Sequence, residues 1–506
     1  MKKVTILLFV ILMLTIVSVV GAQSYPDPGT SVTNAILQNM ATGAGDTATV
    51  VVNYYNTAGS NVYSNPNVTI APKAVVEVKT ENEPLPAGFE GSAIVSSDKP
   101  IASVTSIRNT NVPGAADGTT QGAYNGASAG SETLYFPSFW AFQFIVSRVT
   151  VQNTENATAN IALDFYNRQG TALGTLTTTL PPYGSRTFCG CNPADWPGGV
   201  IPAGFEDGSI TVRSTNGVKL AGASVATWAN RSGAYQALTD ADTGTVLYSP
   251  SAFRFSSSGS INSPTLFSAV NIQNTSSTQT ANVDIEFYNR DNGNLDLTLQ
   301  ASIPPLSAIG ANTLNGGDFP ASAFAALEPS PGVFDWDGAI KIISTNGVAL
   351  AGTGVTNWGT DQKGGMSALA SANTAANKLF LPAQYRLDFG SGWAQWSSIN
   401  LQNVGTDPID RDDLRIEYID TNGNTIATFT GTTGTFALPF DLAPGAALGL
   451  NTRTGGDTSA SAFTSFGLSM IGGIYVSSSD ANDAFVATAN IIYNNRASVY
   501  NAVPSN

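Results

Sequence analysis

The chain has 506 residues, and only 11% of them are charged, against roughly 25% in ordinary soluble proteins. Thirty-six acidic residues against 22 basic ones give a formal net charge of −14, which argues against nucleic-acid binding, because few cations are available to displace phosphate counterions. The absence of histidine excludes Ser-His-Asp and Cys-His catalysis and every histidine-ligated metal site.

The first 22 residues have the pattern of a secretory signal peptide. Two lysines precede an almost wholly apolar run, Val4 to Val20, and Gly21-Ala22 supplies the small residues of a cleavage site. An uncleaved N-terminal anchor is the alternative, although the run is short for a membrane span. No later stretch is long and apolar enough to cross a bilayer. We therefore expect a secreted, extracellular chain that is acidic and has no transmembrane segment after cleavage.

The rest of the chain repeats one order of short motifs four times. The first motif is a strand that ends in Gln-Asn, and its glutamines are 114, 121 and 129 residues apart. A second strand follows in each copy and is closed by a glycine turn. A proline loop and a strand that begins with glycine come next. The Gln-Asn pairs are Gln38-Asn39, Gln152-Asn153, Gln273-Asn274 and Gln402-Asn403; the turn glycines are Gly59, Gly170, Gly293 and Gly423; the proline loops are at Pro72, Pro181-Pro182, Pro304-Pro305 and Pro444; the glycine-led strands begin at Gly91, Gly208, Gly338 and Gly473.

Copies two to four open on an aromatic-x-Pro element, at Tyr135-Phe136-Pro137, Tyr248-Ser249-Pro250 and Phe380-Leu381-Pro382. These elements set the expected boundaries, which are signal peptide 1–22 and repeats 23–133, 134–246, 247–378 and 379–506. Because proline fixes φ and removes a donor, we expect these joints to hold the repeats in a semi-rigid string.

A period of 110 to 130 residues is too long for a solenoid unit and fits one complete sandwich domain. Each copy contains six to eight short runs rich in β-branched and aromatic residues, and several alternate apolar and polar side chains. The predicted fold class is therefore all-β, with four tandem Ig-like antiparallel β-sandwich domains. Helix is scarce, and we expect short helices only at 321–327 and 367–378.

This order of motifs resembles tandem Ig-like β-sandwich repeats of secreted bacterial cell-surface proteins. The segments Pro86-Ala87-Gly88-Phe89 and Pro202-Ala203-Gly204-Phe205, each followed by a glycine-led strand, carry the resemblance. The third and fourth copies depart from this version. The resemblance implies a structural or adhesive role without a shared set of catalytic residues.

Acidic motifs do not point to an enzyme. Asp242-Thr243-Gly244 matches the tripeptide of aspartic proteases, but that chemistry needs two such carboxylates and the chain has one such motif. Asp164, Glu286 and Glu417 occupy matched strand positions, which alternation places on a solvent-exposed face. We expect solubilising charges there, no catalytic residues, and no enzymatic activity.

Calcium is the only cofactor for which the sequence offers candidates. Asp291 to Asp296 and Asp420 to Asn424 resemble fragments of a calcium loop, but neither has the bidentate glutamate of an EF-hand, so hairpin turns are favoured. The denser cluster, Asp407, Asp410, Asp412 and Asp413, is the better calcium candidate.

Two further pairs are candidate sites. Cys189 and Cys191 occur only in the second copy, and in an oxidising compartment they form either a local disulfide or a bridge to another chain. Trp393 and Trp396 lie in a Gly/Ser-rich segment, and we expect them to be exposed and to be candidates for sugar stacking.

The sequence thus predicts a secreted, non-catalytic cell-surface protein, a coat, sheath, filament or adhesin component. Its expected partners are other copies of itself or cell-surface polymers, by multivalent contact or strand addition. The competing hypothesis is an extracellular carbohydrate-binding protein that uses exposed tryptophan and calcium, with glycans as partners.

Overall fold

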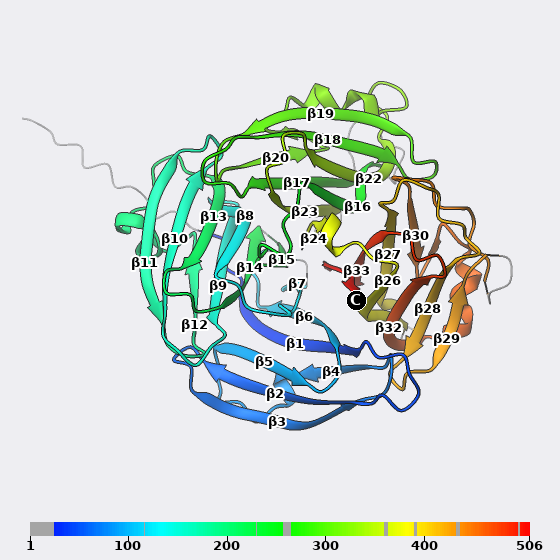
Figure 1. Ribbon diagram of the computed structural model, residues 1–506, viewed down its shortest axis with the longest axis horizontal. Helices are drawn as coiled ribbons and strands as arrows, with labels where there is room; N and C mark the ends of the chain where they lie inside the picture. Colours follow the sequence, from blue (N-terminus) through cyan, green and yellow to red (C-terminus); the bar gives the residue numbers. More distant parts are fainter. Residues whose placement is uncertain are drawn as a thin grey trace, which may run out of the picture.

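A computed structural model describes residues 25–505 except 116, 229, 257–264, 359–362, 389–391, 432–435 and 494–495. The expected signal peptide, 1–22, lies outside the described residues. Within these residues, thirty-five strands form five sheets in which all strand pairs are antiparallel, and the helices are short 3-10 turns. The prediction of an all-β chain of antiparallel sandwiches is confirmed. Figure 1 shows four such units arranged in a ring.

The first repeat, β1–β7, packs two separate sheets face to face, in the orders β4-β1-β6-β7 and β3-β2-β5. The elements are β1 (Thr30–Asn39), β2 (Ala48–Asn56), β3 (Asn61–Ile70), β4 (Val75–Lys79), η1 (Thr80–Asn82), β5 (Gly91–Ser97), β6 (Ile101–Thr110) and β7 (Thr119–Asn125).

In the second repeat, β8–β15, the two sheets are joined through β8, which pairs with β13 in one sheet and with β9 in the other. The elements are β8 (Thr133–Phe142), β9 (Ile145–Asn153), β10 (Ala159–Asn167), β11 (Ala172–Leu180), β12 (Ser185–Cys189), η2 (Pro193–Asp195), η3 (Pro197–Gly199), β13 (Asp207–Ser214), β14 (Leu220–Trp228) and β15 (Arg231–Gln236).

The third repeat, β16–β25, has the same plan, with β16 shared between its two sheets. The elements are β16 (Val246–Phe255), β17 (Leu266–Asn274), β18 (Ala281–Asn289), β19 (Leu295–Ile303), β20 (Ala308–Asn312), β21 (Gly316–Gly317), η4 (Ala321–Leu327), β22 (Asp335–Ser344), β23 (Leu350–Trp358), β24 (Lys363–Ala368), β25 (Ala370–Ser371) and η5 (Ala372–Thr374).

The fourth repeat, β26–β35, has the same strand order as the third, and β26 is the strand shared between its two sheets. The elements are β26 (Lys378–Asp388), β27 (Trp393–Asn403), β28 (Leu414–Asp420), β29 (Thr425–Phe429), β30 (Ala447–Asn451), β31 (Gly455–Gly456), η6 (Ala460–Phe466), β32 (Ser469–Ser478), β33 (Phe485–Tyr493), β34 (Ala497–Asn501) and β35 (Val503–Pro504).

The aromatic-x-Pro elements lie inside the shared strands rather than in linkers between repeats. Pro250 lies where the β16–β22 register shifts between Ser249 and Ala252, and Pro382 lies at the matching shift in β26. Proline cannot donate to a ladder, so within sheets it is confined to edges and bulges. The motif therefore marks the bend at which one strand passes from one sheet to the other.

The Gln-Asn motif recurs because its asparagine ties three segments together. All four asparagines are fully buried, and each Oδ1 accepts the backbone N–H two residues later. Asn274 shows the pattern: its Nδ2 donates to the carbonyls of Gln279 at 2.6 Å and Ile303 at 2.9 Å. Asn39, Asn153 and Asn403 donate to matching carbonyls in their own repeats. A buried amide must find such partners, and no other side chain of this size offers both a donor pair and an acceptor.

Each repeat has its own apolar core between its two sheets, and three of the cores are rich in aromatic side chains. The helix predicted at 321–327 is present as the 3-10 helix η4, which buries Phe324 and Leu327 in the third core. The helix predicted at 367–378 is wrong, because the strands β24 and β25 occupy its first part and only Ala372–Thr374 is helical.

The expected string of repeats is also wrong: the chain closes into a ring (Figure 1). The last long strand of each repeat turns to the centre, where β7 contacts β15, β15 contacts β24, β24 contacts β34, and β34 contacts β7. The fourth repeat therefore contacts the first as well as the third. The sequence pattern could not reveal this closure, because it describes each repeat separately.

Candidate functional site: the junctions between repeats

The two turn motifs singled out in the sequence meet at every junction. The glycine turn of one repeat touches the proline loop of the next: Gly59 faces Pro182, Gly170 faces Pro304, Gly293 faces Pro444, and Gly423 faces Pro72. A Cβ atom on these glycines would lie 1.8 to 2.5 Å from the facing residue, and all four have positive φ. Glycine is thus needed both for the turn and for the close approach. The last of these contacts joins the fourth repeat to the first.

A buried arginine forms the junction between the third and fourth repeats. Arg290 is 12% exposed and bonds Asp337 of its own repeat at 3.0 Å and Asp457 of the next repeat at 3.2 Å. Its third nitrogen donates to Asn400 Oδ1 at 3.3 Å, and a Cβ on Gly449 would lie 1.5 Å from the guanidinium. Burial acts to lower the pKa of Arg290. The two carboxylates have the larger combined effect, so the pKa is raised.

The junction between the second and third repeats uses the same arrangement. Arg168 bonds Asp207 at 2.6 Å within its repeat, and Asp318 at 3.1 Å and Asn271 at 2.8 Å in the next one. Both arginines directly follow the asparagine of the Tyr-Asn strand end, at Tyr166-Asn167-Arg168 and Tyr288-Asn289-Arg290. A single tripeptide therefore specifies two of the four junctions.

The junction that closes the ring depends on a different ion pair. Lys73 Nζ of the first repeat lies 2.9 Å from Glu417 Oε2 of the fourth, and Arg415 bonds the other oxygen at 2.7 Å. Burial raises the pKa of Glu417, but hydrogen bonds from Lys73 and Arg415 outweigh this effect and hold the pKa below its ordinary value. Lys73 also lies over the ring of Tyr475, 5.7 Å from its centroid.

The junction between the first and second repeats has neither ion pair. The rings of Tyr55 and Tyr183 contact each other with centroids 5.0 Å apart, and Ser185 N donates to Thr57 O at 3.3 Å. The four junctions thus share the glycine–proline contact and differ in the side chains around it.

At the centre of the ring, small residues let four strands approach closely. A Cβ on Gly122 of β7 would lie 3.0 Å from the Cβ of Ala234 in β15, and a Cβ on Gly233 would lie 2.5 Å from Met366 Cγ in β24. Gly365 faces Val499 of β34 in the same way, at 2.4 Å. Only small side chains fit these positions.

Polar groups at the centre of the ring form hydrogen bonds from one repeat to another. Asn109 donates to Ser232 at 3.0 Å, joining the first and second repeats. Asn125 and Asn501 exchange hydrogen bonds of 2.7 and 2.9 Å between the first and fourth repeats, and Asn501 also donates to Ala368 O at 2.9 Å. Such pairing fixes the relative positions of the strands, because a buried polar group left without its partner is costly.

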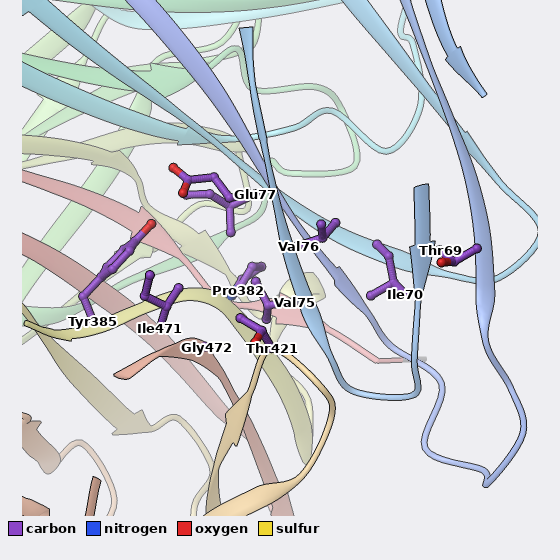
Figure 2. Close-up of a pocket in the computed structure, with 11 residues that line it drawn as sticks. Thr69, Ile70, Val75, Val76, Glu77, Pro382, Tyr385, Thr421, Ile471 and Gly472 are labelled. Carbon is purple, nitrogen blue, oxygen red and sulfur yellow. The ribbon is translucent and has the colours of Figure 1, made fainter. Parts of the chain in front are cut away.

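A pocket of about 270 Å³ lies beside the closing junction, between β4 of the first repeat and β26 and β32 of the fourth (Figure 2). Its polar lining residues are Thr69, Glu77, Tyr385 and Thr421. Glu77 accepts from Asn34 at 3.0 Å and lies 3.5 Å from Lys79, and burial followed by the charge of Glu77 raises the pKa of Tyr385 well above its ordinary value. Tyr385 therefore stays protonated at neutral pH.

The matched acids are not the solvated charges expected from alternation. Asp164 and Glu417 are only 7% and 6% exposed, and Asp164 is bonded by Arg213 at 2.7 Å. Glu286 accepts the Tyr288 hydroxyl at 2.6 Å. The three acids lie on β10, β18 and β28, one in each of three repeats.

The other acidic motifs stabilise turns. Asp242 accepts the Thr239 backbone N–H at 2.9 Å and its hydroxyl at 2.7 Å, and Asp420 accepts two backbone N–H groups of its own hairpin.

Of the calcium candidates Asp407, Asp410, Asp412 and Asp413, Asp410 and Asp413 both lie near Asp483, and their charges help burial to raise its pKa. Asp410 accepts the backbone N–H of Asp412 at 2.8 Å, and the Asp413 carboxylate accepts the hydroxyl of Ser479. Among the described residues, no group of three or more acidic or cysteine side chains is placed to hold a metal ion.

The expectation that Trp393 and Trp396 are exposed is wrong for Trp396, which is 6% exposed on β27. It packs against Ile492 and Ala497, and Arg453 stacks on its ring at 4.5 Å. Trp393 is partly buried beside it, under Arg386. Of the two rings, only that of Trp393 is partly open to solvent.

Cys189 and Cys191 are joined to each other by a disulfide at the end of β12. Asp195 accepts the backbone N–H of Cys189 at 3.1 Å and bonds Arg186 at 3.0 Å, so the loop that follows is tied back to the strand.

Sequence reasoning missed the central strands and the junction arginines. Both could have been found in the sequence. The arginines follow a Tyr-Asn pair in two repeats, and two central strands share a motif: β7 contains Gln121-Gly122-Ala123-Tyr124, and β15 contains Ser232-Gly233-Ala234-Tyr235. This motif, shared by two of the four central strands, places a glycine where the strand packs closely against its neighbours.

Comparisons with known proteins leave the family open. No family model and no curated protein matches the chain. A search of solved structures finds a crystal structure of a tetra-tandem repeat in the extending region of a large adhesion protein, at 12% identity over 95% of this chain and 97% of that chain. Its TM-score of 0.11 is too low to support an inference about fold or function. In the described part of the chain, no helix is long and apolar enough to span a membrane.

Proposed function

We propose that this protein is a secreted, non-catalytic structural component of a cell surface, a rigid disc of four β-sandwiches that serves as a coat, sheath or adhesin unit. The observation that carries the proposal is the closure of the ring. Motifs that recur in all four repeats are used in the contacts between repeats, and the carboxylates that meet at two of the junctions are bonded to a shared arginine.

The arrangement suits a load-bearing or display role. A closed ring has no free joint, so the outer sheets of the four repeats keep fixed positions around the rim (Figure 1). Four similar faces at fixed spacing raise the apparent affinity for a repetitive polymer, provided that its spacing allows simultaneous contact.

Glycan binding is the competing proposal, and because Trp396 is buried, Trp393 is the member of the predicted tryptophan pair that stays partly exposed. A glycan array with the mature chain, with and without a chelator, separates the two proposals. Glycan binding that requires calcium or an exposed aromatic side chain would favour the competitor.

The direct test is immunogold electron microscopy of intact producing cells with an antibody against the chain. We expect a regular surface layer or surface-attached assemblies that label without permeabilisation. Labelling confined to the cell interior, or turnover of a substrate by the purified chain, would contradict the proposal.

A further inference from the structure

The pocket beside the closing junction lies at the place that an arginine fills in two other junctions. Arg168 and Arg290 each follow the last residue of their strand, β10 or β18, and the fourth repeat has Thr421 at the same position after β28. Thr421 is exposed and lines the pocket (Figure 2). Because a threonine side chain is much shorter than that of arginine, the fourth repeat leaves this place partly unfilled.

The acid that holds the arginine within its own repeat is also replaced. Asp207 and Asp337 directly precede the glycine that pairs with the last residue of β10 or β18, and the register of β28 with β32 places Ile471 at this position. Ile471 lines the pocket and is 37% exposed. The fourth repeat thus supplies an aliphatic wall where the second and third repeats supply a carboxylate.

The first repeat changes the other side of the same junction. In the third and fourth repeats, Asn271 or Asn400 pairs with a glycine that lies against the guanidinium of the preceding repeat. The register of β1 with β4 places Ile36 and Glu77 at these two positions, and both line the pocket. The first repeat therefore brings a carboxylate to the side of the junction on which a guanidinium lies elsewhere in the ring.

The pocket combines this carboxylate with apolar walls. Its volume is about 270 Å³, and most of its lining side chains are aliphatic. Glu77 accepts a hydrogen bond from Asn34 at 3.0 Å, and its contact with Lys79 is longer, at 3.5 Å, with the lysine side chain 41% exposed. An exposed pair of this kind contributes little, so Glu77 remains able to bind a second cation.

We propose that this pocket binds an arginine side chain of a partner protein, with the guanidinium paired to Glu77 and the methylene groups against the aliphatic walls. A guanidinium is more weakly hydrated than an ammonium group and presents a planar fork of donors to a carboxylate, so it suits such a pocket better. The formal net charge of −14 attracts a basic partner. The inference goes beyond the proposed function, because it depends on the closed ring and names the chemistry of a partner.

Saturation-transfer NMR of the mature chain with N-acetyl-arginine N-methylamide tests the inference, because this compound carries the arginine side chain on a capped backbone. The citrulline compound of the same form is its uncharged counterpart, and the lysine compound carries an ammonium group instead. We expect the arginine compound to bind, the citrulline compound to bind about tenfold more weakly, and the lysine compound to bind more weakly than the arginine compound.

Three variants locate the site. Thr421→Arg places at the pocket the residue that the second and third repeats have there, and we expect it to abolish binding. Thr57→Arg is the matched control, because Thr57 is exposed at the same position after β2 and lies at the junction between the first and second repeats. It should leave the affinity for the arginine compound unchanged. Glu77→Gln should weaken binding of the arginine compound about tenfold and leave that of the citrulline compound unchanged.

Several results would overturn the inference. They are a wild type that binds none of the compounds, equal binding of the arginine compound and either of the other two, and undiminished binding by Thr421→Arg or Glu77→Gln. None of these results bears on surface labelling of cells, so the failure of this inference and that of the proposed function are distinguishable.

Discussion

Replacing Arg290 with alanine tests whether the repeats are joined by the contacts described. The side chain is 12% exposed and bonds two carboxylates and one amide across the junction between the third and fourth repeats. Its loss leaves Asp337, which is 40% exposed, and Asp457, which is 19% exposed, without their cation. Breaking a fully buried pair costs about 3–5 kcal/mol, and partial exposure reduces this, so we expect Arg290→Ala to destabilise the protein by about 2–3 kcal/mol.

A double-mutant cycle separates the contact between repeats from the contact within one. Urea unfolding, followed by tryptophan fluorescence, is measured for Arg290→Ala, Asp457→Ala and the double variant. We expect a coupling energy of about 1–2 kcal/mol. Arg108→Ala is the control, because its pair with Glu81 is 47% exposed on both sides and exposed pairs contribute about 1 kcal/mol or less. A coupling energy indistinguishable from zero would refute the claim that Arg290 and Asp457 join the third and fourth repeats.

Three further predictions concern the buried asparagine of the Gln-Asn motif, the central strands of the ring, and the junction between the fourth and first repeats. Asn274→Ala should lower the free energy of unfolding by about 3 kcal/mol in chemical denaturation, because it leaves buried carbonyls without a donor. Gly233→Val should cost about 2–3 kcal/mol in the same assay, since its Cβ would lie 2.5 Å from Met366 Cγ. The third prediction concerns pH. The folded-state pKa of Glu417 lies below its ordinary value of 4.5, so its pair with Lys73 stabilises the protein fully above pH 4.5. This stabilisation is lost as the pH falls through the lowered pKa. Unfolding measured from pH 7 to pH 3 should show this loss in the wild type and a smaller one in Glu417→Gln.

Each of these predictions has an outcome that contradicts it. Asn160→Ala, at an exposed position, is the control for the asparagine tie, and equal losses in both variants would show that the tie is not special. A Gly233→Val protein of undiminished stability would mean that the central strands are further apart than described. Parallel pH profiles for Glu417→Gln and the wild type would remove the ion pair from the closing junction.

The architecture of each repeat could be predicted from sequence because local patterns determine it. The Gln-Asn pairs, the turn glycines and the proline loops each have a local conformational requirement, and their common order reveals four copies. The ring could not be predicted in this way, because its contacts join residues such as Lys73 and Glu417 that are 344 positions apart.

Predictions of exposure failed for a related reason. Alternation correctly separates the two faces of a strand, but it assumes that the outer face meets water. Glu417 lies on an outer face that the first repeat covers, and the ring of Trp396 lies under the cationic side chains of Arg453 and Lys363, the latter from the third repeat. Whether a face is covered depends on how complete domains pack against each other.

Small-angle X-ray scattering of the mature chain in solution tests the closed ring most directly. For a compact body of this length the radius of gyration should be about 23 Å, whereas four sandwiches in an extended string would give about 40 Å. We predict a value close to the smaller figure and a scattering profile that matches the ring. A radius near the larger figure, with a profile typical of a rod, would contradict the account.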